Sequence, residues 1–338
     1  MIAAGAVAAG AFAAEVKALV EWYRRGHRDL PWRRTQDPYR IWVSEIMLQQ
    51  TRAQAVIPYY QRFLDRFPTL EALAAAAEQD VLALWAGLGY YSRARNLRRA
   101  AQLMVEAGGF PREYGAIREL PGVGDYTAAA VASIAFELPH AVVDGNVLRV
   151  VARMENDAAD IAAPRTRERF RTIVQTWMGR SEPGVFNQAL MELGATVCLP
   201  ANPLCRDCPV AGSCRARAAG TVGQLPVKLR KKEPVAIAAV LLLVRRGERV
   251  LLRQKEAAAR RMAGFWELPA PEELHGARTG KIWGEFRHTI THHHYTFTVQ
   301  SAAVRAIGAD FRWFSAAELG EIPLSTTARK ALKLAGFL

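Results

Sequence analysis

The four cysteines are the feature that most constrains how this chain can fold. They all fall within one short stretch and follow the spacing C-x6-C-x2-C-x5-C, at Cys198, Cys205, Cys208 and Cys214. A cytoplasmic protein would not keep two disulfides in so short a loop, so the pattern indicates a metal site. Four thiolates can hold either zinc or an iron–sulfur cluster, and the spacing by itself does not decide between them.

Length and composition indicate a globular protein with a polyanionic partner. The chain has 338 residues, 51% of them hydrophobic and 23% charged, which suits two domains with separate cores. Its net charge of +13 favours nucleic acid as the partner, although a basic surface that only aids solubility is the alternative. Residues 1–14 are apolar but lack a basic start and are too short to span a bilayer, so we expect a cytoplasmic protein with no membrane association.

A glycine-rich turn, Leu-Pro-Gly-Val-Gly at residues 120–124, precedes an alanine-rich stretch. Gly122 and Gly124 permit a tight turn, and we expect Asp125 to cap the helix that follows. The unpaired N–H groups at such a helix start can bind phosphate, but the same pattern also occurs in ordinary turns. Asp144 adds a carboxylate in an apolar setting, just before another predicted helix.

Two further segments combine polar or aromatic side chains with an apolar or basic background. Glu45 is a carboxylate within the mostly apolar stretch 41–48, so it is either a partnered structural group or a carboxyl held in a dry pocket with a raised pKa. The polar residues that follow it, including Gln50 and Thr51, suit a base edge or a phosphate. At 85–93 a glycine-punctuated loop carries paired tyrosines beside arginines, which could stack on bases or cap the core.

Hydrophobic periodicity predicts helices in the first part of the chain and β structure after residue 235. We expect helices at 15–25, 41–67 (one or two), 93–105, 149–155, 165–178 and 183–197, with an extended segment at 30–34. The basic, helix-breaking stretch 221–234 is a predicted linker. Beyond it we expect a hairpin from 236–244 and 249–253, strands within 285–300 and a helix at 326–335. The predicted domains are therefore 1–220 and 235–338.

Taken in order, these motifs resemble the MutY-type adenine DNA glycosylases over nearly the whole chain. The resemblance rests on Leu30–Arg33, Trp42–Thr51, the loop Gly87–Arg93, the glycine hairpin, Val143–Val147 and the cysteine spacing. It implies a mainly α helix-hairpin-helix catalytic domain, built from a six-helix subdomain and an iron–sulfur helical subdomain. It also implies a [4Fe–4S] cluster on the four cysteines and a C-terminal α/β domain with a MutT-like (Nudix) fold.

The resemblance implies a hydrolase that removes adenine mispaired with 8-oxoguanine or guanine in base excision repair. Cleavage of an N-glycosidic bond needs a proton donor and an anion beside the sugar. By resemblance Glu45 protonates adenine at N7, and Asp144 stabilises or briefly bonds the sugar. Tyr126 and Asn146 support Asp144. Adenine must leave the duplex, and the residues that match DNA- or base-binding positions are Trp32, Arg33, Gln50, Thr51, Leu88, Tyr90, Gly122, Gly124 and Gln188.

Tyr126 indicates a monofunctional enzyme, because related endonuclease III-like enzymes carry there a lysine that forms a Schiff base and cuts the strand. A bifunctional glycosylase/lyase and a non-catalytic iron–sulfur DNA-binding module are the alternatives. In the C-terminal domain, Glu272 and Glu273 are too few to hold Mg²⁺ for hydrolysis, which favours a recognition role. Thr291 and His292 match the family's contact to 8-oxoguanine, with Ile290 in place of its aromatic residue. We expect a monomer that acts on double-stranded DNA in the nucleoid.

Overall fold

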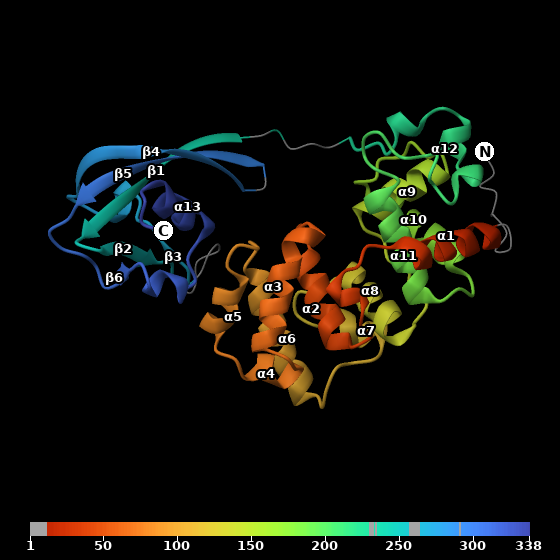
Figure 1. Cartoon of the computed structure of the whole chain (residues 1–338), viewed down its shortest axis with the longest axis horizontal. Coiled ribbons are helices and arrows are strands. Elements are labelled where there is room, and N and C mark those ends of the chain that lie inside the picture. The colour runs from red at the N-terminus through yellow and green to blue at the C-terminus, as the bar shows by residue number, and fades with distance from the viewer. Residues whose placement is uncertain (1–11, 230–232, 234, 257–263, 291) are drawn as a thin grey trace. The chain divides into compact units, whose positions relative to one another are not determined.

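The computed structural model describes residues 12–229, 233, 235–256, 264–290 and 292–338. The chain separates into two compact units, coloured along the sequence in Figure 1. The first unit comprises Met1–Ala74 and Arg99–Lys231, and the second comprises Ala75–Arg98 and Lys232–Leu338. Within the described residues, none of the helices has the length and apolar character that crossing a membrane requires.

The described residues before Val235 form helices and no strands, as the sequence predicted. The α-helices of this part are α1 (Ala13–Gly26), α2 (Pro38–Leu48), α3 (Ala53–Arg66), α4 (Leu70–Ala75), α5 (Glu78–Trp85), α6 (Ser92–Glu106), α7 (Tyr114–Arg118), α8 (Asp125–Phe136), α9 (Gly145–Met154), α10 (Pro164–Met178), α11 (Pro183–Thr196) and α12 (Arg215–Ala218).

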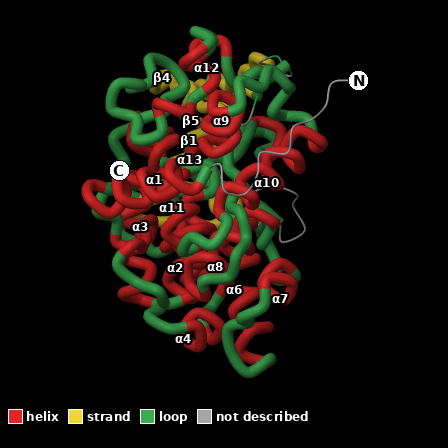
Figure 2. Tube along the Cα trace, turned by 90° about the vertical axis from the view of Figure 1, so that its right-hand side faces the viewer, coloured by secondary structure: helices red, strands yellow, loops and turns green. Residues whose placement is uncertain are grey.

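Helix α2 begins where its sequence supplies a cap and is buried along most of its length. The Asp37 carboxylate accepts a hydrogen bond from the Tyr39 N–H (2.9 Å), and Pro38 occupies the first helical position. Residues 41–47 are all buried, and α2 and α8 lie side by side in both views (Figures 1 and 2). A polar side chain within residues 41–47 of α2 therefore lies in the interior of the first unit.

Helices α1, α9, α10 and α11 share a hydrophobic core in the first unit. Leu19, Val150, Phe170, Phe186 and Leu193 are members of this cluster, and each is at most 2% exposed. Since α11 also packs against α8, it joins the pair α2 and α8 to this cluster. Helix α8 therefore packs against both α2 and α11.

Two local predictions for the helical part were wrong. Asp125 does not cap α8, because Gly124 is the N-cap residue and Asp125 instead pairs with Arg118. The segment at 30–34 is only partly extended. Leu30 has extended backbone (φ −113°, ψ 135°), as expected for a residue before proline, but Pro31–Arg33 form one turn of 3-10 helix.

The second unit contains a six-stranded mixed sheet. Its strands are β1 (Val235–Arg246), β2 (Arg249–Gln254), β3 (Trp266–Glu267), β4 (Arg278–Ile290), β5 (His293–Ala303) and β6 (Phe311–Ser315), and α13 (Thr326–Leu334) packs against it. The order is β3-β2-β1-β5-β4, with β6 on β2. The predicted hairpin of β1 and β2 is confirmed, with Arg246 opposite Arg249. The two long strands β1 and β5 run parallel, with Val235 opposite His293.

Alternation along β1 gives the sheet two apolar faces. Leu241 and Leu243 belong to the core cluster that includes Ala331 and Leu332 of α13, whereas Leu242 and Val244 belong to a separate cluster. This period of two is that of a strand buried on both faces.

Candidate functional site

Glu45 is a buried carboxyl with a raised pKa. Glu45 is 5% exposed, and its Oε2 atom has no hydrogen-bond partner among the described residues. Burial raises the pKa of Glu45 to about 7; a hydrogen bond from Tyr126 opposes this rise, repulsion by Asp144 adds to it, and the charge of Arg33 opposes it. Such a group can donate or accept a proton near neutral pH.

Asp144 is held at the start of α9 as its N-cap. Its carboxylate accepts hydrogen bonds from the Val147 N–H (2.7 Å) and from the Asn146 side-chain amide (2.9 Å). Burial raises the pKa of Asp144, while these two hydrogen bonds and the charge of Arg149 lower it. The two carboxyls are thus in different environments: Asp144 is hydrogen-bonded on both oxygens, and Glu45 is in a drier place.

Asn146 is fixed by the close approach of α9 and α11. Arg149 donates to the Asn146 side-chain oxygen (3.0 Å) and to the carbonyls of Gly194 (2.7 Å) and Cys198 (2.7 Å). A Cβ at Gly194 would lie 2.6 Å from Asn146 Cβ, so only glycine permits this approach. The hydrogen bonds of Asn146 and Arg149 therefore connect Asp144 to Cys198, the first cysteine of the cysteine loop.

Tyr126 is buried next to Glu45 and Asp144. Burial raises the pKa of its hydroxyl well above the ordinary value, and the negative charges of Glu45 and Asp144 raise it further. The hydroxyl therefore stays protonated; it donates to the sulfur of Met191 on α11 (3.5 Å) and interacts with the Glu45 carboxyl. The structure thus brings together Glu45, Tyr126, Asp144 and Asn146, the four residues predicted to be catalytic.

A buried ion-pair cluster lies beside this group. Glu192 on α11 is 1% exposed and accepts hydrogen bonds from Arg28 (2.6 Å) and Arg33 (2.7 Å). Burial would raise the pKa of Glu192, but the bonds from the two arginines lower it to about 2. Arg28 and Glu192 are not among the residues predicted from the sequence. A lone carboxylate on an apolar helix, the signal used for Glu45, would have found Glu192.

The other predicted base-pocket residues lie next to this cluster. The Tyr23 hydroxyl donates to the Gln188 side-chain oxygen (3.1 Å), and the Arg33 guanidinium lies 5.4 Å from the centre of the Tyr23 ring. Trp32 is 7% exposed and packs edge-on against Tyr60. Arg33 and Gln188 are therefore joined through Tyr23, whereas Trp32 belongs to the core.

The predicted DNA-contact residues at the two loops differ in exposure. Gln50 in the first unit is exposed and has a left-handed backbone (φ 59°), and the Thr51 hydroxyl donates to Gln49 O (3.4 Å). In the second unit Tyr90 is 47% exposed, also with positive φ (49°), whereas Leu88 is 8% exposed. Gln50 and Tyr90 are thus accessible to a ligand, and Leu88 is mostly covered.

The glycine hairpin is exposed between α7 and α8. Gly122 has φ 77°, and Gly124 caps α8 with extended backbone; both glycines are exposed. Arg171 lies 3.5 Å from Asp125, which also pairs with Arg118. The exposed backbone at this end of α8 can accept a phosphate, whereas both arginines are already paired with Asp125.

In the second unit, His292 lies between the ends of β4 and β5, and its ring centre is 4.0 Å from that of His293. Thr291 lies outside the described residues. Glu273 sits in a 3-10 turn, Pro271–Glu273, and accepts from Lys255 Nζ (2.9 Å) and from Arg253. That carboxylate is therefore already used in ion pairs within the domain.

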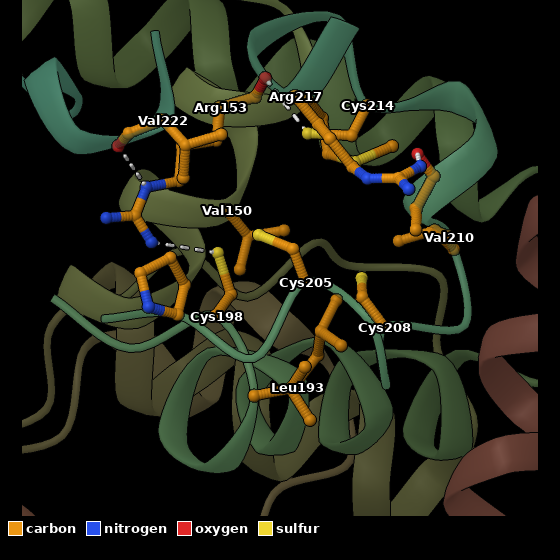
Figure 3. A pocket seen from close by; sticks show the side chains of 14 residues that line it. Val150, Arg153, Leu193, Cys198, Cys205, Cys208, Val210, Cys214, Arg217 and Val222 are labelled. Carbon is orange, nitrogen blue, oxygen red and sulfur yellow. Dashed lines mark hydrogen bonds between the residues drawn. The ribbon is translucent and has the colours of Figure 1, made fainter. Parts of the chain in front are cut away.

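All four cysteines line one cavity of about 30 Å³ (Figure 3), whose wall includes Val150, Leu193 and Val210. Arg153, which is 1% exposed, donates to the sulfur of Cys198 (3.3 Å) and to the carbonyls of Leu199 and Pro200. Burial raises the pKa of the Cys208 thiol to about 11, and the neighbouring cysteines add to this rise. Burial therefore favours the protonated form of the Cys208 thiol.

The four sulfurs share this cavity, and four thiolates can hold either zinc or an iron–sulfur cluster. Within the described part of the chain, no group of three or more His, Cys, Asp or Glu side chains is arranged to hold a single metal ion.

Two known families match different parts of the chain. Residues 43–176 match the HhH-GPD superfamily base excision DNA repair proteins, and residues 239–334 match the NUDIX domain. Among solved structures, a thermostable thymine-DNA glycosylase is 29% identical with a TM-score of 0.55, over 61% of this chain and 95% of that one. An endonuclease III bound to DNA, 21% identical with a TM-score of 0.51 over 61% and 94%, shares the fold.

Several curated relatives are named adenine DNA glycosylase. The human protein is 48% identical over 210 residues, which cover 59% of this chain and 38% of that protein. The protein of Buchnera aphidicola subsp. Baizongia pistaciae is 35% identical over 257 residues, which cover 74% of this chain and 70% of that protein. The chain thus spans well under half the length of the mammalian relatives and most of the length of this bacterial one.

Proposed function

Because the chain belongs to the adenine DNA glycosylase family, we propose that it is a monofunctional glycosylase that excises adenine mispaired with 8-oxoguanine or guanine in base excision repair. The observation that carries this proposal is the pair of Glu45 and Asp144. Glu45 keeps its proton to about pH 7 because it is buried, and Asp144 is hydrogen-bonded as an anion would be. Two carboxyls with separated pKa values are what N-glycosidic cleavage requires.

In the proposed reaction, the bond between C1′ of the sugar and N9 of adenine breaks. Glu45 gives its proton to N7, so the bonding electron pair leaves with a neutral base. Asp144 stabilises the positive charge that develops on the sugar, or bonds C1′ transiently. Water then adds to C1′, its proton returns to the Glu45 carboxylate, and an abasic site remains.

The base must be turned out of the duplex to reach these carboxyls. We assign the adenine pocket to Arg33 and Gln188, with Glu192 holding Arg33 in place. Trp32, although 7% exposed, is assigned to the wall of this pocket. Gln50 and Tyr90, which are exposed, are assigned to the opened duplex. Further DNA contacts are assigned to Thr51, Leu88, Gly122 and Gly124.

Tyr126 supports a glycosylase without strand cleavage. The phenol donates hydrogen bonds and cannot form a Schiff base with the sugar, so the product strand stays intact at the abasic site.

The second domain is assigned to recognition of the oxidised guanine through His292 and Thr291. We place the catalytic domain at 1–220, a basic linker at 221–234 and the recognition domain at 235–338. The proposed partner is mispaired double-stranded DNA, bound by a monomer associated with the nucleoid in the cytoplasm.

We assign the four cysteines to a [4Fe–4S] cluster, which fits their shared cavity and the donor set. When bound, the cluster supplies positive charge that keeps the four sulfurs as thiolates and fixes the loop 198–214. Arg153 holds this loop from α9 through its bonds to Cys198, Leu199 and Pro200. No step of base release passes through the cluster.

The activity is tested with labelled duplexes that carry adenine opposite 8-oxoguanine, adenine opposite guanine, or thymine glycol. We expect adenine release from the first two, and strand breaks only after heat or alkali. Efficient trapping of a covalent adduct with borohydride, or cleavage at thymine glycol, would favour the endonuclease III-like alternative. DNA binding without base release would favour the non-catalytic one.

The cluster is tested by metal analysis of the purified protein. We expect ~4 iron atoms per chain and a yellow-brown colour, since four thiolates hold one cubane. Replacing any one cysteine by serine should lower iron content and DNA binding. Stoichiometric zinc without visible absorbance would contradict the assignment.

A further inference from the structure

The loop between α5 and α6, residues 86–91, is held in one conformation by bonds to its own carbonyls; we call it the tyrosine loop. The Trp85 indole donates to Gly89 O (3.2 Å), and Arg93 Nη2 donates to Leu88 O (3.1 Å) and Gly89 O (3.1 Å). The Arg93 N–H donates to Tyr90 O (2.8 Å), and its guanidinium lies over the Trp85 and Tyr90 rings. Arg93 is 9% exposed, so a buried cation ties the loop together.

The two tyrosines of this loop have opposite surroundings. Tyr90 is 47% exposed, whereas Tyr91 is 5% exposed. Tyr91 is covered by Phe265, whose ring centre is 3.8 Å from its own at an angle of 39°, and Phe265 is fully buried. The two residues are far apart in the sequence but belong to the same compact unit.

Phe265 is fixed to the sheet on its other side. The Lys255 N–H donates to Phe265 O (2.9 Å), and the Gly264 N–H donates back to Lys255 O (2.8 Å). The next residue, Trp266, pairs with Gln254 of β2. Gly264 touches the helical segment too, since a Cβ there would lie 3.5 Å from Arg95 and 3.7 Å from Gln79. The backbone at Phe265 is therefore hydrogen-bonded to the end of β2 while its ring covers Tyr91.

We propose that Phe265 is a positioning residue: it covers Tyr91 and so fixes the tyrosine loop in the form that presents Tyr90 to DNA. A covered tyrosine and an exposed one are adjacent in sequence, so a shift of Tyr91 moves the backbone of Tyr90 directly. The functional part rests on the proposed role of Tyr90 in the opened duplex. In consequence, the sheet domain supports excision opposite guanine as well as 8-oxoguanine, separately from any reading of the lesion by His292.

The positioning is tested by hydrogen exchange in the full chain, with Phe265→Ala and the milder Phe265→Leu, which keeps apolar bulk should the alanine variant fold poorly. The reporters are the amides of Leu88, Arg93 and Arg95, which donate to Trp85 O, Tyr90 O and Tyr91 O. We expect exchange to rise roughly tenfold or more in Phe265→Ala and less in Phe265→Leu, because a buried ring is lost. Phe337→Ala, which removes a half-buried ring from the sheet core, is the control and should leave these amides unchanged.

A double-mutant cycle with Tyr91→Leu tests the ring contact itself. An aromatic pair of this kind should give a coupling of ~2–10-fold in exchange rate between positions 91 and 265. Additive effects, or unchanged exchange in Phe265→Leu, would overturn the proposal.

The functional consequence is tested by single-turnover adenine release. Phe265→Ala should slow release opposite guanine and opposite 8-oxoguanine by the same factor, whereas His292→Ala should change their ratio. Faster exchange with unchanged release opposite both bases would overturn the role of Phe265 in excision. Absence of release by the wild-type protein would overturn the proposed function instead, while the exchange result would still decide whether Phe265 holds the loop.

Discussion

Replacing Glu45 with glutamine should stabilise the free protein above pH 7 and at the same time abolish base release. The wild-type carboxyl is 5% exposed, and its Oε2 has no hydrogen-bond partner among the described residues. Ionisation therefore places a negative charge where neither water nor a close donor compensates it fully. Glutamine has nearly the same shape and never acquires that charge, so the cost of ionisation disappears in the variant.

The size of the effect follows from the pKa of Glu45. Its value rises from 4.5 to about 7 on folding, and at ~1.36 kcal/mol per pH unit this interval amounts to ~3 kcal/mol. A group whose pKa is raised in the folded state binds protons more tightly there. Its stabilising contribution is therefore complete below pH 4.5 and is lost as the pH rises through about 7. The stability difference between the variant and the wild type should grow by ~2–3 kcal/mol from about pH 5 to about pH 8.5.

The difference is measured by thermal unfolding of both proteins across this pH range. For a unit of this size, ~2–3 kcal/mol corresponds to a gain of roughly 4–12 °C in Tm for Glu45→Gln at the alkaline end. Glu106→Gln, at the exposed end of α6, is the control and should show no such growth. Base release by the variant should fall by ~10²–10⁴-fold with DNA binding retained. A Tm difference that is independent of pH would refute the reasoning, because it would mean that water reaches the carboxylate.

Three further outcomes are expected. Asp144→Asn should abolish base release but leave binding to mispaired DNA intact, since it removes a transition-state interaction; a loss of only a few-fold in single-turnover rate would contradict this. Glu192→Gln should destabilise the protein by roughly 3 kcal/mol, because it leaves Arg33 buried without its partner. In the wild type the pKa of Glu192 is lowered to about 2, so the stabilisation from this ion pair should persist above pH 4.5 and be lost toward pH 2, as acid unfolding would show. His292→Ala should narrow the preference for 8-oxoguanine over guanine by roughly an order of magnitude, measured as the ratio of excision rates, since one base contact is worth ~1–3 kcal/mol.

The sequence predicted the fold class and the family, and both are confirmed. Helix periods, a hairpin and turn glycines are local signals, so residues near one another in the chain are enough to predict the elements. The parallel pairing of β1 with β5 is different, because its register joins Val235 to His293 across more than fifty residues. Nothing local in either strand specifies that partner. The 3-10 turn at Pro31–Arg33 was also missed, because proline restrains the residue before it but leaves those after it open.

At the site, sequence motifs identified candidate residues but did not show how deeply each one is buried or which groups bind it. Glu45 could have been a partnered structural carboxylate, and only the fold shows that its surroundings are dry. Glu192 has the same sequence signature on α11 but is the partnered case, held by two arginines. Leu88 was predicted to contact DNA, yet it is mostly covered, and its contact stays a prediction. Burial depends on which helices pack together, so a single stretch of sequence cannot reveal it.

Glu45, Asp144 and Glu192 differ in pKa or in hydrogen bonding because different groups surround their carboxyls. Glu45 is nearly as buried as Glu192, but the pKa of the first is about 7 and that of the second about 2. The difference is the donor set: one phenol for Glu45 and two guanidiniums for Glu192. Asp144 accepts hydrogen bonds from a backbone N–H and a side-chain amide. In the proposed mechanism Glu45 gives up a proton, so few hydrogen-bond donors should stabilise its charged form. Asp144 stays anionic beside the sugar, so its donors should be uncharged. Glu192 holds two arginines and needs its full negative charge. Exchanging these residue types would not exchange their roles, because each role is set by the groups that surround the carboxyl.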